Sequence, residues 1–155
     1  MPEDRQFCSF IVNDLLLGAD VRRVQEVVRD LEITSVPSAP WAVRGLVNLR
    51  GQVIEAIDIR RCFGIADSAP VQTPFHLIFR TPGGPVSLLV DDMGSVIEIA
   101  SDSPSVATQT LKGRMREIVS AVYRLSNRLL LVVDMDRLLG EIAGAKNSAI
   151  DGGAA

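Results

Sequence analysis

The sequence predicts an all-β protein made of two small closed barrels that pack against each other. Three observations lead to this fold class: the apolar runs are short, turn signals separate them, and β-branched residues are frequent within them. Short strands at this spacing favour closed barrels, because closure removes the exposed edges of a sheet. Each barrel would have a thin core, so we expect the two barrels to pack against each other.

About eight to ten short strands are expected, most of them in hairpins. Strand pairs flank the turn signals Asn13-Asp14, Arg50-Gly51-Gln52, Thr81–Pro85 and Ser126–Arg128. The predicted strands are Phe7–Val12, Leu15–Val21, Leu46–Leu49, Val53–Ile59, Phe75–Phe79, Val86–Val90, Val96–Ala100, Ile118–Leu125 and Leu129–Met135.

The segments between these strands are expected to form helical turns, extended connections or loops. The valines from Val21 to Val28 recur at helical spacing, but valine favours strands, so we expect one helical turn that runs into a strand. Leu31–Pro40 is expected to be extended because of its prolines. Ser101–Thr110 is expected to be an exposed loop, and Asp136–Leu139 a last helical turn.

The polar, proline-containing segment Asp67–Thr73 divides the chain into two halves. We therefore expect a first barrel region at residues 7–66 and a second at residues 74–139, with exchange of strands between them possible. Residues 1–6 and 140–155 are expected to be flexible ends.

Composition excludes several functional classes. The net charge of -3 and the pI near 5.1 argue against a nucleic-acid partner, because phosphate contacts need clustered basic residues. Cys8 and Cys62 are far apart and are expected to be reduced, partly buried thiols. No signal peptide is visible and no apolar run could cross a bilayer, so we expect a soluble, cytoplasmic protein without direct membrane contact.

The residues that catalysis needs are missing from recognisable patterns. The one histidine, His76, stands in an apolar run, and none of the common nucleophile, zinc or phosphate-binding motifs occurs. Asp91-Asp92 follows a predicted strand, as in metal-binding receiver domains, but no alternating helices accompany it. We expect Asp91 to cap a turn into Gly94. Neither enzymatic activity nor a cofactor or metal site is predicted.

Several motifs, in order along the chain, resemble the CheW family. Glu26 stands in VQEVV, and ITSVP with a following proline comes next. The most specific part is RGLVNLRGQVIEAIDIRRCFG at residues 44–64. VSLLVDDMGSVIEI and RLLLVVDMDRLL are similar to two later strands of the family. The resemblance extends from about Phe7 to Leu139.

This resemblance implies a fold and a function. The fold is a pair of five-stranded SH3-like β-barrels on a shared core. The function is that of a non-enzymatic adaptor that couples the cytoplasmic tips of methyl-accepting chemoreceptors to the regulatory domain of the histidine kinase CheA. The chain would reach membrane-associated arrays through these partners and would pair barrel to barrel with the kinase domain.

Two charged partner-binding residues follow from the resemblance. Glu26 and Arg50 match family positions near the receptor-facing surface and are expected to form a carboxylate–guanidinium fork. The alternative is an ordinary surface ion pair. Gly45 and Gly51 are expected to supply backbone freedom, and Asp58 to be a structural turn acid.

Five apolar residues complete the predicted binding site. Val21, Val24 and Val53 would line an apolar groove for a receptor helix, or else belong to the barrel core. Val86 and Leu88 would supply the other wall of this groove. Trp41 is either an interface anchor or, as we favour, a cap on the first barrel.

Three features depart from the family pattern. Glu55 stands where the family usually has proline, so it must point to solvent or find a partner. Ser120 replaces a glycine, and the loop Ser101–Thr110 is short, which predicts a trimmed second barrel.

Two other functional readings remain open. The chain could be a fragment of a larger signalling enzyme, although it has no phosphotransfer helix and no ATP-binding glycine boxes. It could also be an unrelated SH3-like adaptor for proline-rich peptides. Only 5% of the residues are aromatic, so few side chains are available to line the aromatic groove that such peptides need.

Overall fold

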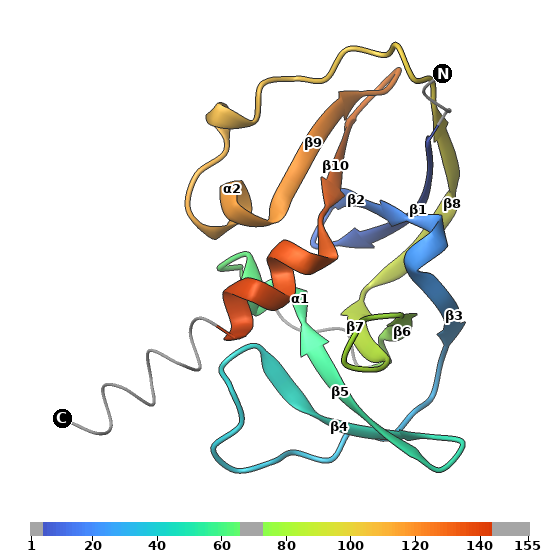
Figure 1. Ribbon diagram of the computed structural model, residues 1–155, viewed down its shortest axis with the longest axis vertical. Helices are drawn as coiled ribbons and strands as arrows, with labels where there is room; N and C mark the ends of the chain where they lie inside the picture. Colours follow the sequence, from blue (N-terminus) through green and yellow to red (C-terminus); the bar gives the residue numbers. More distant parts are fainter. Residues whose placement is uncertain (1–4, 66–72, 144–155) are drawn as a thin grey trace, which may run out of the picture.

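Two five-stranded sheets form the molecule, so the all-β prediction is confirmed. The computed structural model describes residues 5–65 and 73–143 (Figure 1). The terminal sheet has the order β8-β1-β2-β10-β9 and the middle sheet the order β3-β6-β7-β5-β4. The strands of the terminal sheet are β1 (Arg5–Val12), β2 (Leu15–Asp20), β8 (Asp92–Ile99), β9 (Val119–Arg124) and β10 (Leu129–Val133). Those of the middle sheet are β3 (Val24–Val28), β4 (Val43–Leu49), β5 (Gln52–Asp58), β6 (Phe75–Phe79) and β7 (Val86–Val90).

The two barrels do not follow the regions 7–66 and 74–139 strictly, because strands exchange between the halves, which the prediction allowed. Strands β1 and β2 join β8, β9 and β10, while β6 and β7 join β3, β4 and β5. Figure 1 shows the terminal sheet above the middle sheet, with the chain passing between them more than once. Residues 66–72, most of the predicted connector, lie outside the described residues.

Each sheet closes on itself in the same way. In the middle sheet the edge strands are β3 and β4, and Thr34, downstream of β3, pairs with Leu46 in β4 through two backbone hydrogen bonds of 2.8 Å. In the terminal sheet Val106, downstream of β8, pairs with Val122 in β9. Each sheet also contains one parallel pair, β5 with β7 and β2 with β10. Closure removes most of the free edge, at which another chain could otherwise add a strand.

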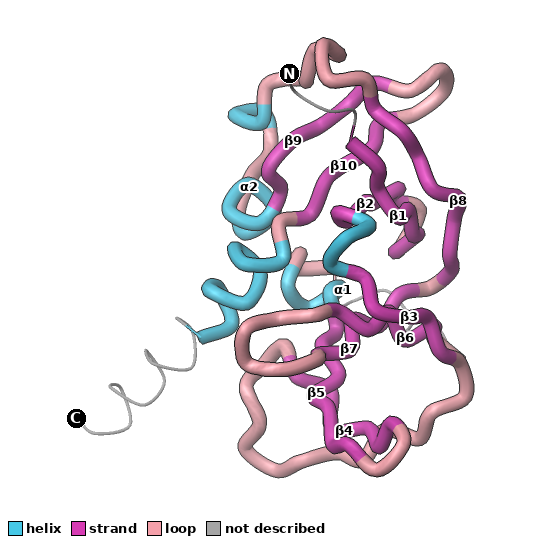
Figure 2. Tube along the Cα trace, turned by 45° about the vertical axis from the view of Figure 1, so that its right-hand side comes forward, coloured by secondary structure: helices cyan, strands magenta, loops and turns pink. Residues whose placement is uncertain are grey.

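Short helices connect and cover the barrels. They are a 3₁₀ turn at Val21–Arg23, α1 (Ile59–Cys62), a second 3₁₀ turn at Thr108–Thr110, α2 (Arg114–Ile118), and a helix at residues 135–143. The turn at Val21–Arg23 runs directly into β3, as predicted. Helix α2 was not predicted. It and the helix at residues 135–143 lie on one side of the molecule (Figure 2).

The last helix corrects the predicted flexible end. It begins before Asp136 and includes residues 140–143, which were assigned to the tail. Met135, Leu138 and Ile142 are buried in the core, at the spacing of one helix face. Residues 1–4 and 144–155, the rest of the predicted ends, lie outside the described residues.

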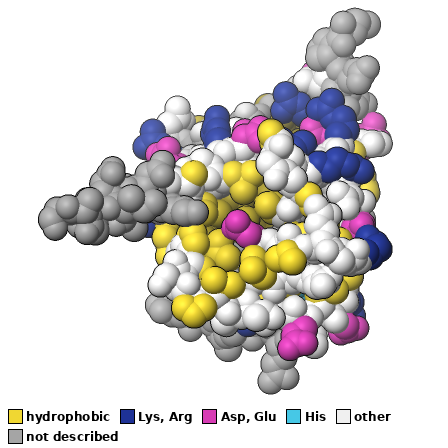
Figure 3. All heavy atoms as spheres, turned by 60° about the horizontal axis from the view of Figure 1, so that its bottom comes forward, with side chains coloured by type: hydrophobic (Ala, Val, Ile, Leu, Met, Phe, Trp, Pro, Cys, Tyr) yellow, Lys and Arg dark blue, Asp and Glu magenta, His cyan; other side chains and the backbone are white. Residues whose placement is uncertain are grey.

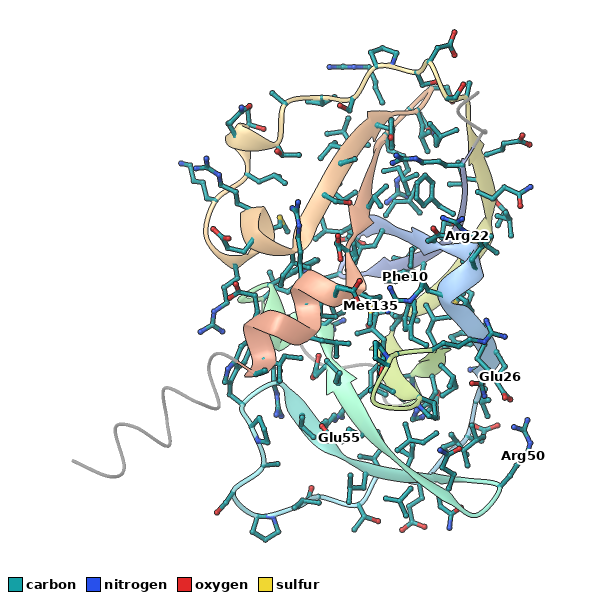
Figure 4. All side chains as sticks on the ribbon, in the orientation of Figure 1. Phe10, Arg22, Glu26, Arg50, Glu55 and Met135 are labelled. Carbon is teal, nitrogen blue, oxygen red and sulfur yellow. The ribbon has the colours of Figure 1, made fainter. Side chains whose placement is uncertain are left out.

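A shared core joins the two barrels, as predicted. Phe10 and Leu17 from the terminal sheet belong to the same buried cluster as Leu77, Phe79 and Leu88 from the middle sheet. In Figure 4 the labelled Phe10 and Met135 lie between the two sheets. Each sheet also buries a smaller cluster of its own, so each barrel core is thin and depends on the common one.

Burial accounts for the cysteines. Both are free thiols; Cys8 is half-buried and Cys62 is fully buried. Desolvation raises the pKa of Cys62 to about 12, so this thiol is unreactive near neutral pH.

No helix in the described ranges is long and apolar enough to span a membrane.

Barrel closure depends on the lack of a side chain at Gly45. A Cβ atom there would lie 2.3 Å from the Thr34 carbonyl oxygen, so Gly45 is needed for space and not, as predicted, for backbone freedom. Gly51 does take a positive φ of 85°. We expect Gly45→Ala to lower the free energy of unfolding by about 1–3 kcal/mol in urea denaturation. Gly140→Ala is the control, since a Cβ atom at this helical position meets nothing within 4 Å. It should be neutral or stabilising, and equal effects at both positions would contradict the closure argument.

Candidate protein-binding surface

The predicted fork between Glu26 and Arg50 is present. Arg50 Nη1 donates to Glu26 Oε2 at 2.9 Å and Nη2 donates to Oε1 at 2.5 Å. Figure 4 shows the two side chains at one side of the middle sheet. The fork links edge strand β3 to the β4–β5 hairpin, which leads to the opposite edge strand β4.

The hairpin turn fixes the position of Arg50. Arg50 and Gly51 both have positive φ, 52° and 85°, as a two-residue type I′ turn requires. The Asn48 side-chain oxygen accepts a hydrogen bond from the Gly51 N–H at 2.8 Å. The guanidinium therefore projects from a rigid turn although its side chain is 70% exposed.

The electrostatics of the fork favour both charged forms. Hydrogen bonds from Arg50, and then from Gln25, lower the pKa of Glu26 from 4.5 to about 2. The same contact raises the pKa of Arg50. A charged fork on an exposed surface contributes little to stability but presents a fixed pattern to a partner.

Titration of Glu26 provides a direct test of the fork. Because its pKa is lowered in the folded protein, the stabilisation should be complete above about pH 4.5 and be lost as the pH falls toward 2. Carboxyl carbon NMR shifts should give a midpoint near 2 for Glu26 in the wild type. In the Arg50→Gln variant the midpoint should return toward 4.5, and a wild-type midpoint already near 4.5 would show that the fork does not persist in solution.

The predicted valines fall into two separate places. Val24 pairs with Phe79, which in turn pairs with Val86, so Val24 and Val86 are half-buried on either side of a buried phenylalanine. Val53 is 65% exposed beside the Arg50 turn. Val21 is half-buried in the 3₁₀ turn before β3.

The prediction for Leu88 is wrong. Its side chain is fully buried in the shared core, and its strand neighbours are Leu77 and Ile57. All residues of β7 after Val86 are buried, so both faces of the strand are covered there. A partner could reach Leu88 only by opening the core.

A hydrogen-bonded ion pair that sequence reasoning missed joins helix α1 to the β7–β8 connection and the β1–β2 turn. Arg60 Nη2 donates to Asp91 Oδ2 at 2.6 Å, and the Asn13 N–H donates to the same oxygen at 2.8 Å. The prediction that Asp91 caps a turn into Gly94 is therefore wrong. Asp58 does act as a turn acid: it accepts the Arg60 N–H at 3.0 Å and begins α1.

Trp41 and His76 have structural surroundings. Trp41 is half-buried against the shared core, with the Arg114 guanidinium 3.9 Å above its ring, which favours the predicted cap. His76 is buried, and its Nδ1 lies 3.0 Å from Ser87 Oγ. Desolvation lowers the pKa of His76, so the ring is neutral near pH 7.

The terminal sheet is complete despite two of the departures noted above. Ser120 is exposed in β9, and its hydroxyl lies 3.5 Å from the Val132 carbonyl oxygen. The loop Ser101–Thr110 is mostly exposed, as predicted, yet its Val106 closes the sheet. With five strands present, the prediction of a trimmed second barrel is wrong.

An apolar hollow, which we call the β5 groove, lies on a different face from the fork. It has a volume of about 420 Å³. Its lining includes Leu46 and Ile57 of the β4–β5 hairpin, Val86 of β7, Val36, and Leu139 and Ile142 of the last helix. Figure 3 shows an apolar area on this face with an acidic side chain within it. Of the described residues that line the groove, only Glu55 is acidic.

Comparisons with known proteins agree on one family. A family model described as "CheW-like domain" matches residues 6–143. Chemotaxis protein CheW of Treponema pallidum is 24% identical over 140 residues, covering 88% of this chain and 82% of that protein. Chemotaxis protein CheW of Thermotoga maritima is 26% identical over 135 residues, covering 86% and 87%. The crystal structure of the scaffolding protein TtCheW from Thermoanaerobacter tengcongensis is similar with a TM-score of 0.73 at 27% identity, covering 86% of this chain and 90% of that chain.

Proposed function

The chain belongs to the CheW-like domain family, and from this premise we propose that it couples chemoreceptors to the kinase CheA. It would bind the regulatory domain of CheA and the cytoplasmic tip of a methyl-accepting chemotaxis receptor. It would catalyse no reaction and need no cofactor. It would act in the cytoplasm and reach receptor arrays at the membrane only through these partners.

One observation supports this proposal above the others: a rigid, charged fork stands exposed on one of two packed barrels. The Arg50 side chain is 70% exposed, although both of its Nη atoms are hydrogen-bonded to Glu26. Folding does not need such an exposed pair, because exposed ion pairs stabilise proteins by only about 0–1 kcal/mol. A fixed bidentate pattern suits recognition of another protein. The relatives named above are chemotaxis proteins and a scaffolding protein, which gives that partner its class.

Coupling of this kind would work through geometry. A scaffold that holds a kinase and a receptor in one array lets a change in the receptor shift the kinase between its active and inactive states. Each contact can be modest in strength, since the array supplies avidity. Val21, Val24, Val53 and Val86 remain predicted contact residues, and Val53 has the most exposed side chain among them.

The test is binding of the full chain to both proteins. Isothermal titration calorimetry with a CheA regulatory domain and with a receptor tip fragment should show saturable binding to each. Both together should form a ternary complex on size-exclusion chromatography. Failure to bind either protein would contradict the proposal, and so would stable transfer of phosphate from labelled ATP or a phosphorylated kinase to this chain.

A further inference from the structure

We propose that the β5 groove binds a protein segment that presents a lysine or arginine among apolar side chains. The groove is open to solvent in the part of the chain that the structure describes, and apolar side chains from the Val36 loop, the β4–β5 hairpin, β7 and the last helix line it. Contiguous exposed apolar surface of this kind marks binding sites in soluble proteins. Val36, at one wall, is itself 38% exposed.

Glu55 determines the chemistry of this groove. It projects from β5 on the same face as Val53 and Ile57, since alternate residues of a strand share a face. No described residue forms an ion pair or a side-chain hydrogen bond with its carboxylate. A carboxylate can keep its charge on an apolar surface as long as water reaches it. A partner that covers the groove removes this water and must replace it with a cation or a hydrogen-bond donor.

Glu55 therefore selects among partners. An apolar segment without a cation would leave the carboxylate buried and unpaired, which is costly, and an acidic segment would be repelled. β5 is an interior strand between β7 and β4, so a partner reads the groove through side chains and not by adding a strand. A protein surface with one basic residue surrounded by apolar ones fits all of these features.

This inference rests on the proposed function in one respect, that the chain acts by binding other proteins. It concerns a surface separate from the fork: Figure 4 shows Glu55 on the part of β5 away from Arg50 and Glu26. The two surfaces would let one chain hold two partners at once.

The groove can be probed without either partner. Hexylammonium and hexanoate have the same alkyl chain and opposite charges. In NMR titrations of the full chain, hexylammonium should shift the signals of Val36, Val86 and Ile142 at about tenfold lower concentration than hexanoate does. Glu55→Gln should remove this preference. Glu98→Gln, at an exposed glutamate of β8, should retain it. Equal binding of the two probes to the wild type would overturn the proposal.

The partner experiment uses the CheA regulatory domain and the receptor tip. Glu55→Lys should weaken binding to one of them by about tenfold or more, while Glu98→Lys leaves both within about twofold. Wild-type binding to both that Glu55→Lys does not change would overturn this inference and leave the proposed function standing. Wild-type binding to neither would overturn the proposed function, and the probe titration would still decide whether the groove prefers a cation.

If Lys146→Gln tightens probe binding, the chain's own C-terminal residues occupy the groove, and the assignment to a partner is wrong.

Discussion

Arg50→Glu is expected to lower the affinity for one of the two proposed partners by about 100-fold or more, while the protein stays folded. The substitution replaces a fork of two hydrogen bonds with two carboxylates that face each other. It also reverses the charge of the side chain at the turn of the β4–β5 hairpin, which is 70% exposed. Calorimetry would measure the affinity, and circular dichroism with thermal denaturation would show that the fold is kept, since Arg50 is exposed.

Two further variants separate the possible causes of that loss. Arg137→Glu is the matched control, because Arg137 is also an exposed arginine close to an aspartate, Asp134, and its reversal should leave binding nearly unchanged. The double variant Glu26→Arg with Arg50→Glu restores an ion pair of opposite direction. If only the turn geometry matters, it should recover binding; if the partner contacts the guanidinium, it should not. Unchanged binding of Arg50→Glu to both partners would refute the assignment of the fork to a binding surface.

Asp91→Ala is expected to lower the free energy of unfolding by about 3 kcal/mol, which is a large part of the stability of a domain this size. The Asp91 and Arg60 side chains are only 19% and 9% exposed, so removal of the carboxylate takes away two charge-assisted hydrogen bonds made by a largely buried guanidinium. It also leaves the Asn13 N–H without its acceptor. These contacts tie the β1–β2 turn of the terminal sheet to α1, which follows the last strand of the β4–β5 hairpin.

The neighbouring residue supplies the control for this effect. Asp92 is exposed, and Asp92→Ala should change stability by less than about 0.5 kcal/mol. Urea denaturation followed by tryptophan fluorescence would measure both variants, since Trp41 packs against the shared core. Loss of similar stability in the two variants would show that the ion pair does not join the barrels in the way described.

The local pattern of the sequence was sufficient for most of the strands. Hairpin turns such as Arg50-Gly51 need particular residues at particular positions, and alternation of apolar and polar residues indicates a strand over a few positions. The helix at residues 135–143 had a readable signal too, because Met135, Leu138 and Ile142 follow helical spacing. Gly140, a weak helix former, and the polar residues that follow it concealed this signal.

The candidate site, too, could be predicted from the sequence only in part. The match to family positions was enough to predict that Glu26 and Arg50 would pair, and the structure confirms the pair but not its binding role. Leu88 could not be excluded from the sequence, because four of the five residues of β7 are apolar and its composition does not tell which of them the shared core buries. The partnership of Arg60 with Asp91 had no signal in sequence spacing.

By itself, the sequence determined that this protein is all-β, where most of its strands and hairpin turns lie, and to which family it is similar. Only the tertiary structure decided which strands share a barrel, that β1 and β2 close with β8 to β10, and that Glu55 lies in an apolar groove without an ion-pair partner among the described residues. The reason is physical: turns and periodicity depend on neighbours along the chain, whereas strand exchange, burial and charge pairing depend on segments that meet only after the chain has folded.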